Sequence, residues 1–273
     1  MKRVWGHLLA GVSLVVGGGA VIAACKHDDS TLFVQGVLAA QPVSAGAQCI
    51  FTSDPTQPFI SSGVLDIAFR NEYDPTFLVG NQAVAEVNSQ QLQTETDIIT
   101  VEGATVRITD ASGVQLNYYT RLCSGTIYPS SGSVPGYAPI TVTALDSNTI
   151  QLDTDLQNNV VAGGTTRLVS YVQFFGQTTG GNSIQSDTFE FPIDVCESTA
   201  DHPCLVGFSA TSDDPNPDLP QPNCAGAVAS SSSLPAPCVP GQDFTVDCSL
   251  CQSVAACHGA DTSGTVVPDA GAD

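Results

Sequence analysis

The stretch TFEFPIDVC, residues 188–196, decides the fold class of this chain. Its apolar side chains fall at every second position: Phe189, Phe191, Ile193 and Val195. A period of two with one apolar face is typical of a half-buried β-strand. Pro192 cannot donate a ladder hydrogen bond, so we expect this strand to lie at the edge of a sheet.

Similar short strands are predicted upstream, within residues 64–70, 105–109, 114–122, 138–145, 148–153 and 167–175. Residues 110–113, Asp-Ala-Ser-Gly, fit a type I turn because Asp stands first and Gly fourth. Residues 81–93 fit a short helix or a strand. Short strands joined by turns rich in Gly, Ser, Asn and Pro predict a mainly β chain, with one antiparallel β-sandwich over residues 31–197, immunoglobulin-like or jelly-roll-like.

The composition changes after Cys196. Residues 198–258 are rich in Pro, Ser and Cys and show no periodicity, and residues 259–273 are expected to form a disordered acidic end. Segments that cannot build a hydrophobic core depend on closed loops for stability. We therefore expect an irregular, disulfide-rich tail after the sandwich.

The N-terminus has the layout of a secretory signal. Lys2 and Arg3 precede an uncharged run, residues 4–24, dominated by Val, Leu, Ala and Gly. The alternative is an uncleaved transmembrane helix, since the run is long enough to span a bilayer. Its five glycines disfavour that alternative, because each Gly costs a helix about 1 kcal/mol relative to Ala.

Residues 22–25, Ile-Ala-Ala-Cys, resemble the lipobox of bacterial lipoproteins. The resemblance implies cleavage of a signal peptide, residues 1–24, and a diacylglyceryl thioether with fatty acyl chains such as palmitate on Cys25. Two or more acyl chains anchor a protein stably to a membrane. Residues 25–30 then form a lipidated tether, and Lys26 beside the anchor favours the outer membrane or cell surface of the bacterial envelope over the inner membrane.

The chain is strongly acidic, with a net charge of −20. Removal of residues 1–24 takes two of its seven Lys and Arg and none of its 27 Asp and Glu, so the net charge becomes −22. Such a surface repels phosphate backbones, and we expect no nucleic-acid partner. The expected partners are the membrane, through the lipid, and other envelope or surface proteins.

Catalytic motifs are absent from the sequence. Lys26 is the one lysine outside residues 1–24, and His27, His202 and His258 are the histidines there. No G-x-S-x-G, H-E-x-x-H, G-x-G-x-x-G or EF-hand pattern occurs. We therefore expect that the protein is not an enzyme and binds no cofactor. A hydrolase that uses a carboxylate pair or His202 is the second alternative.

Cysteines carry most of the remaining signal. After lipidation of Cys25, nine remain as disulfide candidates: Cys49, Cys123, Cys196, Cys204, Cys224, Cys238, Cys248, Cys251 and Cys257. An oxidising compartment favours disulfides among them. Cys49 and Cys123 lie in the β-domain and are able to bridge each other. Nine is an odd number, so at least one must be free, ligated or intermolecular.

The alternative for the last cysteines is a metal-binding or sensing module. Cys248, Cys251, Cys257 and His258 offer soft ligands near the spacing of a tetrahedral zinc site. A c-type haem is excluded because Val254 stands where C-x-x-C-H requires Cys.

Acidic and aromatic clusters suggest weaker alternatives. Calcium requires oxygen ligands, which two groups supply: Asp146, Asp153 and Asp155, and Asp213, Asp214 and Asp218. Asp also suits solvated turns, which is the simpler interpretation. Four tyrosines are candidates for a small aromatic patch: Tyr118, Tyr119, Tyr128 and Tyr137. The sequence therefore favours a non-catalytic lipoprotein with a structural, adhesive or binding role.

Overall fold

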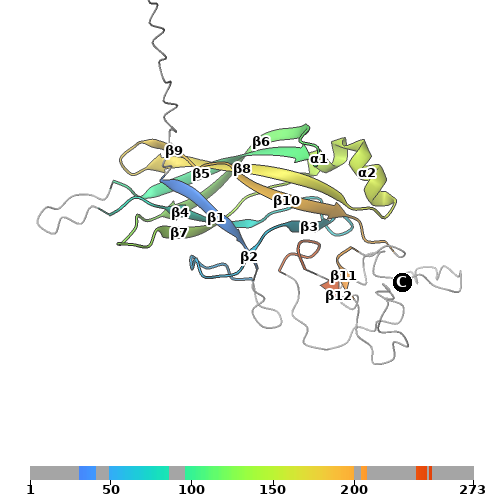
Figure 1. Cartoon of the computed structure of the whole chain (residues 1–273), viewed down its shortest axis with the longest axis horizontal. Coiled ribbons are helices and arrows are strands. Elements are labelled where there is room, and N and C mark those ends of the chain that lie inside the picture. The colour runs from blue at the N-terminus through green and yellow to red at the C-terminus, as the bar shows by residue number, and fades with distance from the viewer. Residues whose placement is uncertain are drawn as a thin grey trace, which may run out of the picture.

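The computed structural model describes residues 31–40, 49–85, 96–199, 204–207, 238–244 and 246–247. Two sheets pack face to face, as Figure 1 shows, with β5, β6 and β8 in one layer and β1, β4 and β7 in the other. The predicted mainly β sandwich is confirmed. Neither helix in the described residues has the length and apolar character needed to cross a membrane.

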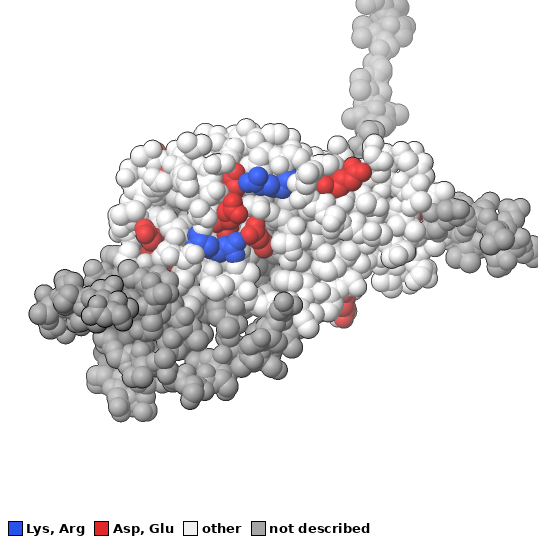
Figure 2. All heavy atoms as spheres, turned by 180° about the vertical axis from the view of Figure 1, so that it is seen from behind, with Lys and Arg blue, Asp and Glu red and all other residues white. Residues whose placement is uncertain are grey.

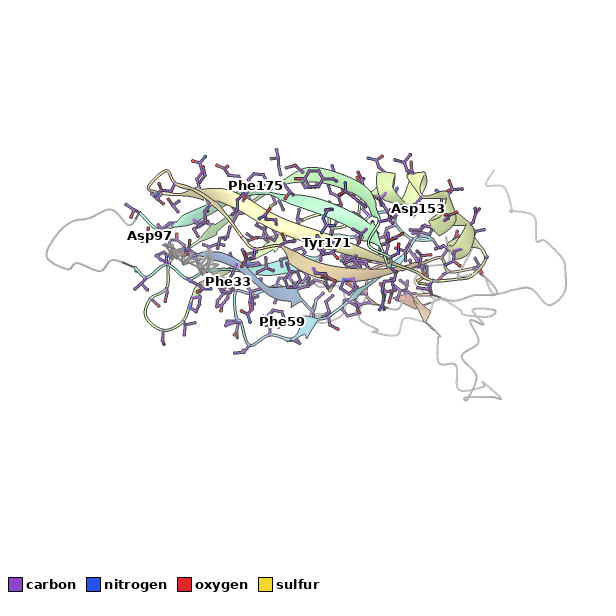
Figure 3. The ribbon with its side chains drawn as sticks, turned by 45° about the horizontal axis from the view of Figure 1, so that its top comes forward. Phe33, Phe59, Asp97, Asp153, Tyr171 and Phe175 are labelled. Atoms are coloured by element: carbon purple, nitrogen blue, oxygen red, sulfur yellow. A yellow bond between two sulfur atoms is a disulfide. The ribbon has the colours of Figure 1, made fainter. Side chains whose placement is uncertain are left out.

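The smaller sheet is antiparallel, with the strand order β2-β1-β4-β7. Its strands are β1 (Leu32–Leu38), β2 (Phe59–Ile60), β4 (Thr76–Asn81) and β7 (Gly136–Thr141). β4 is buried at all six positions. On the outer face of this sheet the ring of Phe33 lies where a Cβ at Gly80 would stand, and the ring of Phe59 lies where a Cβ at Gly36 would stand, so the two glycines leave room for these rings. Phe33 and Phe59 are labelled in Figure 3.

The larger sheet has the strand order β3-β10-β8-β5-β6, and β9 pairs with β8. Its strands are β3 (Gly63–Asp66), β5 (Ile99–Asp110), β6 (Gln115–Ile127), β8 (Thr166–Thr178), β9 (Ser183–Gln185) and β10 (Phe189–Cys196). All its pairings are antiparallel except that of β10 with β3. A separate parallel pair joins β11 (Val206–Gly207) to β12 (Val246–Asp247).

The core lies between the two sheets, where alternate side chains of long strands meet. Phe77 of β4 packs edge-on against Phe174 of β8, with ring centroids 5.4 Å apart. Tyr73 stacks on Phe191 of β10 at 6.0 Å, and both are buried. Burying each such side chain contributes about 1.5–3 kcal/mol to the free energy of unfolding. Because alternate side chains of a strand point to opposite faces, the apolar face of each strand becomes the face that meets the core.

The strand predicted at residues 188–196 forms as β10, but its expected place at an edge is wrong. β10 lies between β8 and β3. β3 pairs with β10 only from Ile193 onward, so Pro192 lies just before the stretch with two neighbours. Pro192 is therefore accommodated in an inner strand because β3, the second neighbour of β10, pairs only with the residues after it.

A helix, α1 (Ser147–Leu152), replaces the strand predicted over residues 148–153, and a second helix, α2 (Thr154–Val161), follows it. Both helices lie at one end of the sandwich in Figure 1. The strand prediction fails because two aspartates cap helix N-termini. Asp146 accepts from the backbone N–H of Thr149, and Asp153 accepts from those of Asp155 and Leu156.

The turn predicted at residues 110–113 joins β5 to β6. The N–H of Gly113 donates to the Asp110 carbonyl at 3.1 Å, and Gly113 has a φ of 88°. The Asp110 carboxylate also accepts from the N–H groups of Ser112 and Val114. These hydrogen bonds lower the pKa of Asp110, with the Ser112 side-chain hydroxyl as the largest cause. Glycine is required here for its positive φ.

Candidate functional site

Several predicted site residues lie outside the described residues. They are Cys25, Cys224, Cys248, Cys251, Cys257 and His258, together with His202, Asp213, Asp214 and Asp218. Within the described part of the chain, no group of three or more His, Cys, Asp or Glu side chains could hold a metal ion. The zinc alternative therefore stays a prediction, and the site must be built from other residues.

Two disulfides join described cysteines. Cys49 pairs with Cys238, with Cα atoms 5.3 Å apart, and Cys196 pairs with Cys204, with Cα atoms 5.9 Å apart. The suggested Cys49–Cys123 bridge is wrong. Cys49 instead connects the sandwich to the Cys-rich region, because residues 238–244 lie against the sheet edge near it.

Cys123 is a free thiol. It lies on the inner side of β6, half-buried and in contact with the core. Burial raises the pKa of this thiol to about 11. Cys123 is therefore an unreactive packing residue, because thiolate rather than thiol is the nucleophile.

A clasp formed by residues 238–244 covers the outer edge of β3. The N–H of Asp66 donates to the Gly241 carbonyl at 2.9 Å, and the N–H of Asp243 donates to the Val64 carbonyl at 3.0 Å. The Asp243 carboxylate accepts from the Val64 N–H at 2.8 Å and from the buried Tyr73 hydroxyl at 2.7 Å. This clasp supplies β3 with the hydrogen bonds that a neighbouring strand would make.

Asp243 carries strain and charge in this clasp. Its φ is 62°, in the left-handed region that non-glycine residues rarely adopt. Burial raises its pKa, while hydrogen bonds from Val64, Tyr73 and Gln242 oppose that change. Burial, followed by the nearby Asp243 charge, raises the pKa of Tyr73 well above its usual range. The hydrogen bonds of this pair therefore hold the clasp in place.

A second buried carboxylate, Asp66, organises the chain after β10. It accepts from the N–H groups of Ala68, Ser198 and Leu205 at 2.9–3.1 Å, and from the Ser198 hydroxyl at 2.5 Å. A buried charge is tolerated when its lone pairs are satisfied in this way. Asp66 therefore fixes the region of the Cys196–Cys204 disulfide against the end of β3.

A cavity of about 170 Å³ lies between the clasp and the smaller sheet. Its polar lining includes Arg70 and Asp74, which form an ion pair at 2.5 Å, and the adjoining Asp243 and Gln242. The Gln242 amide also pairs with the backbone N–H and carbonyl of Asp74 at 3.0 and 3.1 Å. The hydrogen bonds between Gln242 and Asp74 therefore hold the clasp against the sandwich.

The four described arginines all have partners. Arg70 pairs with Asp74, Arg121 with Asp146 at 3.5 Å, and Arg167 with Asp194 at 2.7 Å, whereas Arg107 lies 3.9 Å above the Tyr171 ring. On the face in Figure 2, the blue arginines accordingly lie among red acidic side chains. The guanidinium groups serve the fold rather than an anion site.

The suggested acidic calcium group does not form. Asp146 is buried, caps α1 and accepts from the side chains of Asn117 and Thr149, whereas Asp153 caps α2. Asp153 is labelled in Figure 3 at the end of the sandwich where the helices lie. Asp153 and Asp155 line a shallow groove beside Leu116, away from any third metal ligand among the described residues.

The tyrosines suggested as an aromatic patch are separated. Tyr118 and Tyr119 alternate across β6, so Tyr118 is exposed while Tyr119 is half-buried. Tyr119 donates to the Thr143 carbonyl, and burial, followed by the Asp146 charge, raises its pKa. Tyr137 packs edge-on against Phe33 at 5.9 Å in the other sheet. Tyr128 is also exposed, but it follows the last residue of β6, ten positions along the chain from Tyr118.

The exposed face of β6 is the surface feature that best fits a binding role. Leu116, Tyr118 and Leu122 point outward from it, with 36%, 58% and 86% of their surface exposed. Arg121 points inward to Asp146. Sequence reasoning missed this surface because apolar residues stand on both faces of the strand, so the period of two does not say which face is buried.

Comparisons with known proteins add little. No family model matches the chain, and no curated protein matches it. A crystal structure of a protein from Archaeoglobus fulgidus shares 12% identity and a TM-score of 0.28, over 49% of this chain and 90% of that one. Similarity at this level does not bear on function.

Proposed function

We propose that this chain is a lipoprotein of the bacterial cell envelope, anchored through Cys25, with a non-catalytic adhesive or binding role. The observation that carries the proposal is the pair of disulfides, Cys49–Cys238 and Cys196–Cys204. Disulfides persist in oxidising compartments such as the periplasm and the cell surface. They agree with the export signal and the lipobox at the N-terminus.

The position of β1 fits an anchored protein. β1 begins at Leu32, so six residues separate it from Cys25. Six fully extended residues span at most about 20 Å. The lipid would therefore keep the sandwich close to the membrane surface, and its partners would be other molecules at that surface.

The exposed side chains of β6 support a binding role. Soluble proteins seldom leave neighbouring large apolar side chains uncovered, and such surfaces commonly serve interactions. Leu116, Tyr118 and Leu122 form such a row on one strand. Their use by a partner needs no catalytic group.

The anchor is tested by labelling cells with radioactive palmitate and following processing with and without globomycin. The wild-type protein should take up label, and globomycin should leave it unprocessed. Cys25→Ser should abolish label and processing, whereas Cys123→Ser, which also removes one thiol, should leave both unchanged. Unchanged processing of Cys25→Ser would contradict the anchor.

A further inference from the structure

The free edge of β6 has a defined polarity. β6 ends its sheet and has β5 as its neighbour. The N–H of Tyr118 donates to the Asn117 side-chain oxygen at 2.8 Å rather than to β5. In an antiparallel strand the N–H and C=O of one residue point to the same side, and successive residues alternate. The backbone groups of Thr120 and Leu122 therefore also point toward this free edge.

The other strands at the ends of these sheets are protected against pairing. β2 and β9 have only two and three residues, β7 contains Pro139, and β3 is covered by residues 241–243 of the clasp. Short strands, proline and covering loops are the usual ways in which proteins block an edge. β6 has thirteen residues with neither Pro nor Lys, so among the described strands it is the longest that stands at the end of a sheet.

A shallow groove of about 280 Å³ adjoins the first residues of β6. Leu116 and Leu152 supply apolar walls, and Leu152 is 81% exposed. Asp153 and Asp155 supply negative charge to the same groove. A basic side chain with an apolar stem, as in Arg or Lys, fits this combination.

We propose that β6 accepts an extended segment of a second protein as an added antiparallel strand, with a basic residue at that segment's C-terminal end. Antiparallel pairing places that end beside the groove at the start of β6. Alternate apolar side chains of the segment would lie beside Leu116, Tyr118 and Leu122 on the same face of the sheet. Main-chain hydrogen bonds give affinity in this mode of recognition, and side-chain pockets give specificity.

Charge favours a basic partner over a second copy of this chain. Each processed copy carries a net charge of −22, since Lys2 and Arg3 leave with residues 1–24, so two copies repel each other, whereas a cationic segment is attracted. This inference rests on the proposed function and deepens it by naming the surface and the class of partner. It would fail separately from the anchor, because palmitate labelling does not depend on β6.

The test uses the full-length lipoprotein in detergent and a labelled nine-residue peptide that alternates Val and Thr and ends in Arg amide. Matched peptides end in Glu or carry the Arg at the first position. Fluorescence anisotropy at low salt measures affinity, and amide hydrogen exchange follows residues 115–122. The Arg-ended peptide should bind about tenfold more tightly than either matched peptide and should protect these amides.

Two variants locate the binding. Leu122→Thr should weaken binding of the Arg-ended peptide about tenfold, while Val161→Thr, which changes an exposed apolar residue at the end of α2, should leave it unchanged. Asp155→Asn should narrow the difference between the Arg-ended and Glu-ended peptides several-fold. Circular dichroism and thermal unfolding check that each variant is folded.

Three outcomes would overturn the proposal. The first is equal affinity, or no affinity, for the three peptides. The second is binding that leaves the amides of residues 115–122 unprotected. The third is concentration-dependent dimerisation of the lipoprotein that Leu122→Thr abolishes, which would assign this edge to a second copy of the chain.

Discussion

At the scale of single residues, the buried carboxylates of Asp66 and Asp243 decide how the Cys-rich region meets the sandwich. The Asp66 carboxylate accepts four hydrogen bonds, two from Ser198 and one each from Ala68 and Leu205. The Asp243 carboxylate accepts from Val64 and Tyr73. Neither role is visible in the sequence, because Asp66 stands at a polar position of a predicted strand and Asp243 follows Pro240 and Gly241 in a stretch typical of a turn. Their importance comes from burial.

The thiol of Cys123 should resist alkylation in the folded protein. Its pKa is raised from 9.0 to about 11, so at pH 8 the folded state holds about a hundredfold less thiolate than the unfolded state. Peptide mass spectrometry after iodoacetamide treatment measures the rate at Cys123 with and without urea. Equal rates in the two states would contradict the buried position.

The ionisation of Asp243 should make folding depend on pH. Its pKa is raised above 3.8 by burial, so the folded state holds this proton more tightly than the unfolded state. The contribution of Asp243 to the free energy of unfolding therefore falls as pH rises from 3.8 through the raised pKa, and is constant above it. Relative to wild type, Asp243→Asn should gain stability as pH rises through that window.

Asp54→Asn provides the control for Asp243. Hydrogen bonds to Thr56 lower the pKa of the exposed Asp54, so its effect has the opposite sign. Relative to wild type, Asp54→Asn should lose stability as pH rises. Urea unfolding at several pH values measures both differences, and parallel pH profiles for the two variants would contradict the assignment.

At the scale of elements, capping overrides strand propensity between β7 and β8. Residues 148–153 alternate apolar and polar side chains, yet they form α1 and its C-terminal boundary. Asp146 and Asp153 satisfy N–H groups that would otherwise lack partners, and Leu156 and Val160 bury one face of α2. A spacing of four between buried residues is helical, whereas a spacing of two is extended.

Removal of the α2 cap should be measurable. Asp153→Ala loses the acceptor for the N–H groups of Asp155 and Leu156, at a cost of about 1 kcal/mol in the free energy of unfolding. Asp153→Asn keeps a side-chain oxygen and should stay within a few tenths of a kcal/mol of wild type. Urea unfolding gives both values. The same loss in both variants would show that the cap is not the cause.

At the scale of the whole molecule, the two disulfides act over very different distances along the chain. Cys49–Cys238 joins residues 189 positions apart, and Cys196–Cys204 joins residues 8 apart. Closing a longer loop removes more entropy from the unfolded chain. The long-range bridge therefore holds the clasp of residues 238–244 beside the β-domain that precedes it in the sequence.

The loss of the long-range bridge should cost more stability. From loop entropy alone, the double variant Cys49→Ser/Cys238→Ser should lose about 5 kcal/mol, and Cys196→Ser/Cys204→Ser about 2.5 kcal/mol. Urea unfolding measures both, and Cys123→Ser is the control for removal of a thiol. A larger loss from the short-range bridge would contradict this ranking.

The period of two was sufficient to identify β10, β8 and β5 as strands of a sandwich, because side-chain alternation is a local property of extended backbone. The turn at residues 110–113 was predictable for the same reason, since Asp and Gly act on their own backbone. The resemblance of residues 22–25 to a lipobox and the net charge of −20 are likewise read from the sequence alone.

Only the tertiary structure decided which strand stands at an edge, which cysteines pair, and which acids are buried. Pro192 is tolerated in an inner strand because β3 pairs with β10 only from Ile193 onward. Cys49 pairs with Cys238 because residues 238–244 fold back against β3. The exposed row on β6 likewise depends on which of its two mixed faces meets the other sheet. These outcomes depend on contacts between segments far apart in the chain, which local patterns do not encode.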